Sequence, residues 1–161
     1  MESAVRNQRL IDELADARAA LFDRLAEIAP ESMTTPGLTG EWSARELIAH
    51  LGYWAGHATE VIHAVEQGRA EEVDADQPSV DEVNETVARI ARQTDLATVR
   101  KREAASVEAL MARLGELDPA LLADRLPDGA TLEEGIREDG AAHYREHADD
   151  LAAILDERPH G

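Results

Sequence analysis

The sequence GEWSARELIAHLGYW, residues 40–54, decides the fold class more than any other stretch of the chain. Ser43 and Glu46 stand three residues apart before an apolar run, which is the spacing of a capping box at the start of a helix. Large apolar residues then recur every three or four positions, the period of a helix with one buried face. We therefore predict a helix over about residues 44–67, ended by Gly68.

Outward from this stretch, the same helical period recurs with similar boundary signals. Hydrophobic residues make up 43% of the chain but aromatic residues only 3%, a composition that favours helix packed on helix over sheets. The remaining predicted helices cover residues 3–29, 80–92, 96–117 and 131–155, with a short helical turn over 119–124. The predicted fold class is therefore all-α, an up-down four-helix bundle with a long crossover connection, in a single domain spanning residues 1–161.

Composition argues against several classes of function. The formal net charge of −18 repels nucleic-acid phosphates and anionic lipid, and the only dense basic run is Arg100-Lys101-Arg102, so we expect no nucleic-acid partner. The chain has no cysteine, which excludes disulfides, thiolate nucleophiles and cysteine-ligated zinc. The N-terminus lacks a signal-peptide pattern, and no apolar run approaches the roughly 20 residues that span a bilayer. We therefore expect a cytoplasmic location and no membrane partner.

Histidines are the residues with the clearest chemical potential. His143 and His147 are four apart on the last predicted helix, which stacks both imidazoles on one face where they can share an ion. His50 lies on the apolar face of its helix and is a candidate third ligand, and His57, two turns further, competes for that role. Isolated core and surface histidines are the alternative explanation. Two histidines, one on a solvated helix face and one in the polar tail, are set aside: His63 and His160.

Three sequence motifs match a known pattern in order along the chain. Residues 40–54 carry Trp-Ser at a helix start, then His-Leu and an aromatic; HYREH at residues 143–147 is a His-x-x-x-His; and VDEVN begins at Val80. In these motifs the chain resembles the DinB-like superfamily, which includes bacillithiol transferases, the N-terminal domain of mycothiol-dependent maleylpyruvate isomerase and colibactin-resistance proteins. The resemblance implies a four-helix bundle with a divalent metal held by His50, His143 and His147. It places His57 outside the ligand set, near the metal or in the core.

Three imidazole ligands leave coordination positions open, which is the arrangement of catalytic rather than structural metal sites. Zinc and nickel both suit such ligands, and the ion would lower the pKa of a bound water to about 7 or hold a thiolate. The resemblance implies a metal-dependent thiol S-transferase or hydrolase that acts on small electrophilic molecules in detoxification or resistance. Because the chain has no cysteine, the thiol would be a co-substrate such as mycothiol or bacillithiol. The alternative is a non-catalytic ligand-binding or self-protection protein of the same fold.

Three carboxylates lie near the histidine pair in sequence: Asp139, Glu146 and Asp150. Each is a candidate to orient a ligand imidazole through its free N–H or to act as a general base. Plain surface acidity is the competing explanation in a chain of this charge. The partners expected from the sequence are a small-molecule substrate and a second copy of the chain in a homodimer.

Overall fold

The computed structural model describes residues 2–157, and every regular element in that range is a helix. In chain order the elements are α1 (Glu2–Leu25), the short 3-10 helix η1 (Pro30–Ser32), α2 (Ala44–Glu66), η2 (Ala70–Glu72), α3 (Val80–Arg92), α4 (Leu96–Glu116), η3 (Pro119–Ala123), α5 (Leu132–Asp139) and α6 (Ala141–Glu157). The predicted all-α class is confirmed.

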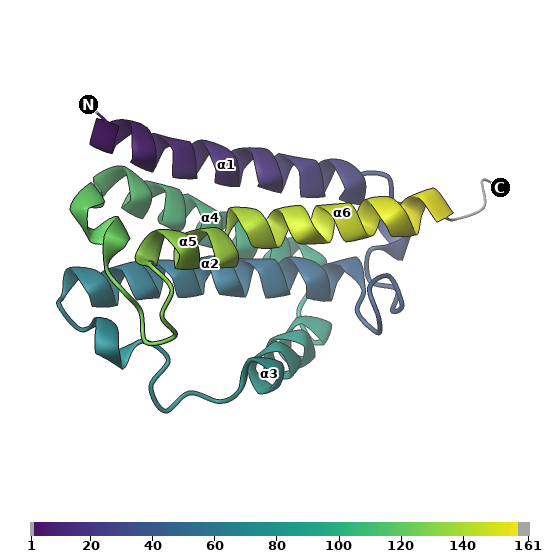
Figure 1. The fold of residues 1–161 in the computed structure, drawn as a ribbon. Coiled ribbons are helices and arrows are strands. Elements are labelled where there is room, and N and C mark those ends of the chain that lie inside the picture. Colours follow the sequence, from purple (N-terminus) through teal and green to yellow (C-terminus); the bar gives the residue numbers. More distant parts are fainter. Residues whose placement is uncertain (1, 158–161) are drawn as a thin grey trace.

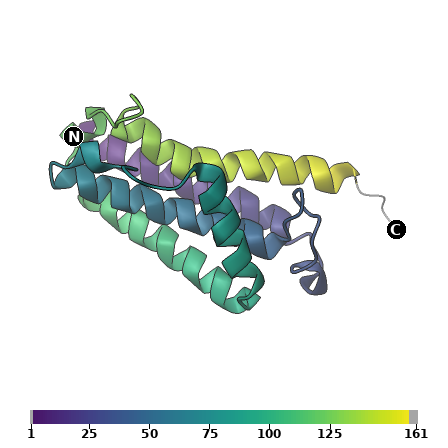
Figure 2. The ribbon, with the colours of Figure 1, turned by 90° about the horizontal axis from the view of Figure 1, so that it is seen from below.

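Four long helices, α1, α2, α4 and α6, lie alongside one another and form the bundle (Figure 1). α1 packs mainly on α6, and α2 packs mainly on α4. Followed along the chain, α1 and α6 run in one direction and α2 and α4 in the other (Figure 1). Residues 67–95 cross back along the bundle before α4 begins, and α3, within this crossover, lies obliquely over α2 (Figure 2). The predicted long crossover connection is thus confirmed.

The helix starts follow local side-chain chemistry. The backbone N–H of Ser43 donates to the Glu46 carboxylate at 3.0 Å, within the capping box that the sequence predicted. The Asp95 carboxylate accepts a hydrogen bond from the backbone N–H of Thr98 at 3.1 Å, which starts α4 where a helix break was expected. Thr131 caps α5 in the same way. These caps place the helix boundaries close to their predicted positions.

The last predicted helix, residues 131–155, is two helices in the structure. Gly140 separates α5 from α6 with a non-helical backbone (φ −110°, ψ −106°). A Cβ atom at Gly140 would lie 2.9 Å from the carbonyl oxygen of Ile136, so this close turn requires glycine. The prediction of one continuous helix was wrong, because the apolar period continues through the glycine although the backbone does not.

The buried core consists mainly of aliphatic side chains from the four long helices. Leu47, Ile48 and Leu51 of α2 are fully buried, and His50 stands on the same helix with 6% of its surface exposed. The fold therefore places an ionisable imidazole at the edge of an apolar core. No helix within residues 2–157 is both long enough and apolar enough to cross a membrane.

Candidate metal centre

The structure brings together the three histidines selected from the sequence. His50 on α2 faces His143 and His147 on α6, and one ring nitrogen from each lies within 4.8 Å of the others. The Nε2 atoms of His50 and His143 are 2.8 Å apart. The ring centroid of His50 is 4.6 Å from that of His143 and 5.3 Å from that of His147, and the last two centroids are 5.0 Å apart. The three imidazoles therefore converge on one small volume.

The protonation and hydrogen bonding of these imidazoles fit a metal ion. Burial, and then the charges of His143 and His147, lower the pKa of His50 to about 3. Burial, and then His147, lower the pKa of His143 to about 4, and burial also lowers the pKa of His147. All three rings are therefore neutral near pH 7, the form that binds metals. The Nδ1 atoms of His50 and His147 are buried and have no hydrogen-bond partner among the described residues. These two ring nitrogens therefore still lack the partner that buried polar atoms usually have.

A buried carboxylate fixes α6 against α1 and α4. Glu103 of α4 is 1% exposed and accepts two hydrogen bonds from the Arg18 guanidinium of α1, at 2.7 and 2.8 Å. The hydroxyl of Tyr144, also fully buried, donates to the same carboxylate at 2.6 Å. Bidentate, charge-assisted hydrogen bonds of this kind are strong and directional. Because Tyr144 directly follows His143, this contact restrains the rotation of α6 that turns His143 towards α2.

Sequence reasoning missed this carboxylate, although a signal for it exists. Glu103 occupies the apolar stripe of α4 between Val99 and Val107, where a charge is not expected unless it has a partner. A Cβ atom at Gly52 would lie 2.9 Å from the Cα of Glu103, so α2 and α4 approach closely at this level. The partner Arg18 lies on another helix, and no spacing in the sequence identifies it.

His57 does not join the other histidines. Its Nδ1 lies 2.5 Å from a carboxylate oxygen of Asp139, at the end of α5, and its Nε2 lies 2.7 Å from one of Asp74, in the crossover. Burial lowers the pKa of His57, but the hydrogen bonds and charges of Asp139 and Asp74 outweigh burial and raise the pKa to about 9. His57 is therefore a cation that holds two segments to α2. His63 is exposed, and His160 lies outside the described residues.

The three carboxylates near the histidine pair have different surroundings. Asp139 is committed to His57, and burial raises the pKa of its carboxyl. Glu146 is exposed on α6. Asp150 is also exposed, and its carboxylate lies 4.0 Å from Nδ1 of His147, close to the metal centre but beyond hydrogen-bond distance. Of the three, only Asp150 approaches a candidate ligand with its carboxylate.

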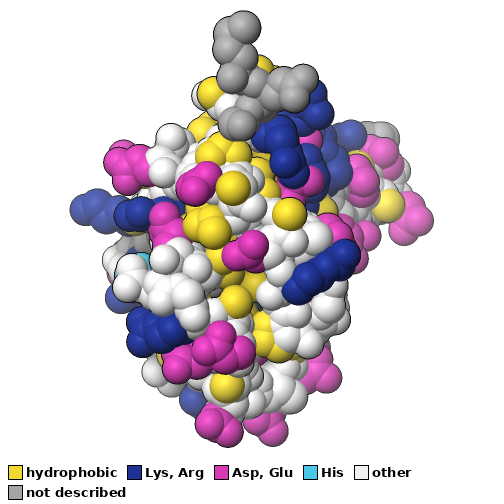
Figure 3. Space-filling view, turned by 60° about the vertical axis from the view of Figure 1, so that its left-hand side comes forward, with side chains coloured by type: hydrophobic (Ala, Val, Ile, Leu, Met, Phe, Trp, Pro, Cys, Tyr) yellow, Lys and Arg dark blue, Asp and Glu magenta, His cyan; other side chains and the backbone are white. Residues whose placement is uncertain are grey.

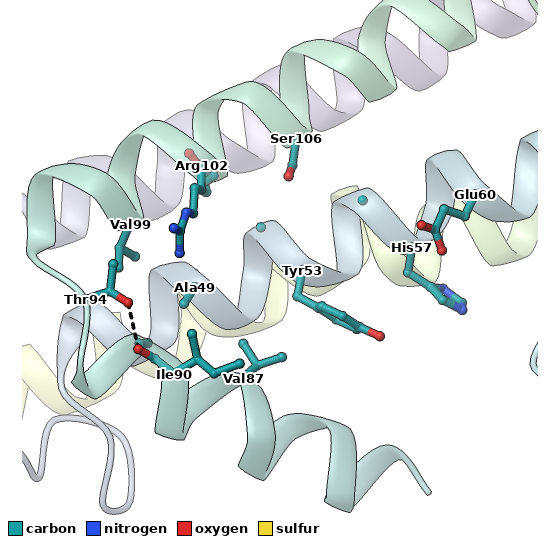
Figure 4. Close-up of a pocket in the computed structure, with 14 residues that line it drawn as sticks. Ala49, Tyr53, His57, Glu60, Val87, Ile90, Thr94, Val99, Arg102 and Ser106 are labelled. Atoms are coloured by element: carbon teal, nitrogen blue, oxygen red, sulfur yellow. Dashed lines mark hydrogen bonds between the residues drawn. The ribbon is translucent and has the colours of Figure 1, made fainter. Parts of the chain in front are cut away.

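A cavity of about 370 Å³ lies between α2, α3 and α4 and is lined by none of the three histidines. Its walls are mainly apolar, and Tyr53, Arg102 and Ser106 point towards it (Figure 4). His57 lines one end of the cavity, on the same helix as His50 (Figure 4). The three converging imidazoles therefore lie outside the lining of this cavity, although α2 contributes to both features.

Comparison with solved structures finds the same fold in a colibactin self-resistance protein, ClbS, crystallised in complex with a dsDNA. The TM-score is 0.76 at 16% sequence identity, and the match covers 95% of this chain and 97% of that chain. A likeness at this identity establishes the fold. No curated protein sequence matches the chain.

The expectation that excluded nucleic-acid partners was wrong. It rested on net charge, and a protein of the same fold has been crystallised with duplex DNA. Net charge describes the whole molecule, whereas phosphate contacts depend on where the basic side chains stand. Arg100, Lys101 and Arg102 are all exposed on α4, and on the face seen in Figure 3 basic side chains stand in small groups among acidic ones.

The sequence model of one protein family matches most of the chain. This family is described as the mycothiol maleylpyruvate isomerase N-terminal domain, and the match covers residues 14–152. That range begins within α1 and includes α2 with His50 and the part of α6 with His143 and His147. The chain therefore belongs to the mycothiol maleylpyruvate isomerase N-terminal domain family, within the DinB-like superfamily.

Proposed function

We propose that the chain is a metal-dependent enzyme of the DinB-like type, a thiol-dependent transferase or hydrolase that acts on small electrophilic molecules. The observation that carries the proposal is the convergence of the His50, His143 and His147 ring nitrogens within 4.8 Å. In this proposal the three imidazoles hold one divalent ion, zinc or nickel, because both suit nitrogen ligands. The ion would act as a Lewis acid on an oxygen or sulfur atom of the substrate.

The chain's own residues prepare this site in three ways. Burial keeps the three imidazoles neutral, so their lone pairs are available at pH 7. The ring of Trp42 packs 4.8 Å from that of His50 and covers one side of it. Tyr144, held by Glu103, restrains α6 so that the pair on α6 faces α2. Because the chain has no cysteine, the thiol in this proposal is a co-substrate of the mycothiol or bacillithiol kind.

Metal analysis of untagged protein tests the ligand assignment. We expect one zinc or nickel ion per chain and a loss of at least about 100-fold in metal affinity for His50→Ala, because two imidazoles of one helix do not complete the site. His63→Ala on the same helix is the matched control, because this histidine is exposed, and it should bind metal like the parent. Normal helicity by circular dichroism shows that both variants fold. Full metal occupancy in His50→Ala would show that the assignment is wrong.

Activity of the metal-loaded protein separates the reaction classes. With an alkyl halide or epoxide as the electrophile, a transferase consumes the low-molecular-weight thiol stoichiometrically with product, whereas a hydrolase forms product without it. Loss of product formation in His50→Ala, both with and without the thiol, would place the chemistry at this site if His63→Ala keeps the parental activity. Metal binding without turnover of any electrophile would favour the non-catalytic alternative.

The second candidate is a non-catalytic self-protection protein that associates with duplex DNA. It is favoured by the shared fold with ClbS, whose structure contains a dsDNA, and by the exposed basic run Arg100-Lys101-Arg102. Fluorescence anisotropy of a labelled duplex titrated with the chain measures this association directly. No saturable change at any salt concentration would remove this candidate.

A further inference from the structure

The cavity between α2, α3 and α4 has the size and walls of a ligand site. Its volume of about 370 Å³ falls in the range of small-molecule pockets. Gly52 and Gly56 line it on α2, and Val87, Ile90 and Ala91 line it on α3. At Gly52 the missing side chain lets α2 approach Glu103 of α4, and at Gly56 a Cβ atom would contact the Ser106 hydroxyl at 3.7 Å.

The apolar part of the lining is incompletely covered. Ile90 of α3 is 51% exposed and Tyr53 of α2 is 40% exposed, and both line this cavity. Among the described residues, the other large hydrophobic side chains with comparable exposure are Val5 and Val80. Figure 4 shows Ile90 beside Val87 on α3, with Tyr53 on the facing helix. An apolar molecule between these side chains would remove their surface from water, which is favourable.

The polar part of the lining carries an unpaired positive charge. Arg102 and Ser106 stand one turn apart on α4 and both project towards the cavity (Figure 4). Arg102 forms no salt bridge with any residue in the described range. The nearby Glu103 does not neutralise it, because both Glu103 oxygens are occupied by Arg18 and Tyr144.

Two carboxylates line the cavity, Glu103 beside Arg102 and Glu60 near the other end. Glu60 lies beside His57, away from Arg102 (Figure 4). The cavity therefore has an apolar centre and two polar ends. At one end Arg102 and a hydroxyl group stand beside Glu103, whose carboxylate is already bonded to Arg18 and Tyr144. At the other end Glu60 lies beside the cationic imidazole of His57. A guanidinium and a hydroxyl on the same helix face suit a carboxylate, because both groups donate hydrogen bonds to its oxygens.

We propose that this cavity binds a small hydrophobic carboxylate, an aryl or medium-chain acyl acid. Its carboxylate binds Arg102 and Ser106, and its apolar body lies between Tyr53, Val87 and Ile90. The site does not depend on the metal centre, because none of the three histidines lines it. Its test is therefore independent of the proposed reaction.

Binding of phenylbutyrate and of phenylbutanol to the full chain tests the proposal, since the two probes share an apolar body and differ in charge. We expect saturable binding of the acid, measured by calorimetry, and at least about tenfold weaker binding of the alcohol, because a charge-assisted hydrogen bond contributes about 1.5 kcal/mol or more. Arg102→Gln should weaken binding of the acid about tenfold and leave the affinity for the alcohol unchanged. Arg100→Gln removes the same charge from the same helix outside the cavity lining, and should change neither.

The location of binding is read from amide chemical shifts by NMR. Shifts produced by the acid should cluster on residues 49–60, 87–94 and 99–106, and metal removal with a chelator should leave the affinity unchanged. Because Arg102 and Arg100 are exposed, both variants should keep the parent fold. The proposal is overturned by no saturable binding of the acid, by equal effects of the two arginine variants, or by shifts centred on His143 and His147.

Discussion

Two glycines of α2, four residues apart, meet α4 with different amounts of space. A Cβ atom at Gly52 would lie 2.9 Å from the Cα of Glu103, whereas one at Gly56 would make an ordinary 3.7 Å contact with the Ser106 hydroxyl. We expect Gly52→Ala to lower the free energy of unfolding by about 1 to 3 kcal/mol, because the α4 backbone at the buried Glu103 must move to make room for the new methyl group. Gly56→Ala should raise it by up to about 1 kcal/mol through helix propensity.

Urea denaturation of the two alanine variants beside the parent measures both effects. Each variant serves as the control for the other, since the chemical change and the helix are the same. Equal stabilisation by both would contradict the close approach of α2 to α4 at Gly52.

For single residues, the sequence predicted the direction of a side chain where the pattern of one helix was sufficient. The spacing of His143 and His147 fixes their shared face, and the apolar neighbours of His50 fix its inward direction. The pairing of His57 with Asp74 was not predictable, because the crossover that carries Asp74 has no period to orient it. Asp74 also has a left-handed backbone (φ 58°), a conformation set by its loop.

At the element scale, His57 joins three segments that are distant in sequence: α2, the crossover at Asp74 and the end of α5 at Asp139. The pKa of His57 is about 9 in the folded chain against an ordinary value of 6.5. A raised pKa means that the stabilisation is fully present below pH 6.5 and is lost as pH rises through about 9. Burial raises the pKa of Asp139, so part of the gain from this ion pair is offset.

We therefore expect the free energy of unfolding to fall by about 1 to 2 kcal/mol between pH 6.5 and about 9, measured by denaturation at fixed ionic strength. His57→Gln should be less stable than the parent at pH 6.5 and should show a much weaker dependence on pH over this range. His63→Gln, on the exposed side of the same helix, should keep the parental slope. A parental slope in His57→Gln would show that other groups cause the pH dependence.

Element boundaries were predictable where a side chain caps a helix, as Ser43, Asp95 and Thr131 do. The break at Gly140 was not, because a glycine inside an apolar period is compatible with either a continuous or an interrupted helix. The crossover was expected because a long stretch that contains Pro78, and no short turn, separates α2 from α4. Its effect, α2 and α4 running in the same direction, depends on contacts between elements and required the structure.

At the scale of the whole molecule, the net charge of −18 and the local basic run of α4 act over different distances. The Debye length is about 30 Å at 10 mM salt and about 8 Å at 150 mM, so repulsion between the acidic chain and a duplex reaches far only at low salt. In that candidate function, contacts between phosphates and Arg100, Lys101 and Arg102 would act at short range. Salt therefore has two opposing effects on the association with DNA that the second candidate function requires.

We expect duplex affinity to rise from about 10 mM to about 100 mM salt, as the long-range repulsion is screened, and then to fall as counterions compete for the phosphates. Fluorescence anisotropy across this range gives the profile. Lys101→Gln should lower the affinity at its maximum, whereas Arg89→Gln, an equal loss of exposed charge on α3, should change it little. A steady fall in affinity from the lowest salt would mean that the duplex meets a basic surface large enough to overcome the net charge. Equal losses in the two variants would show that the basic run on α4 is not the DNA contact.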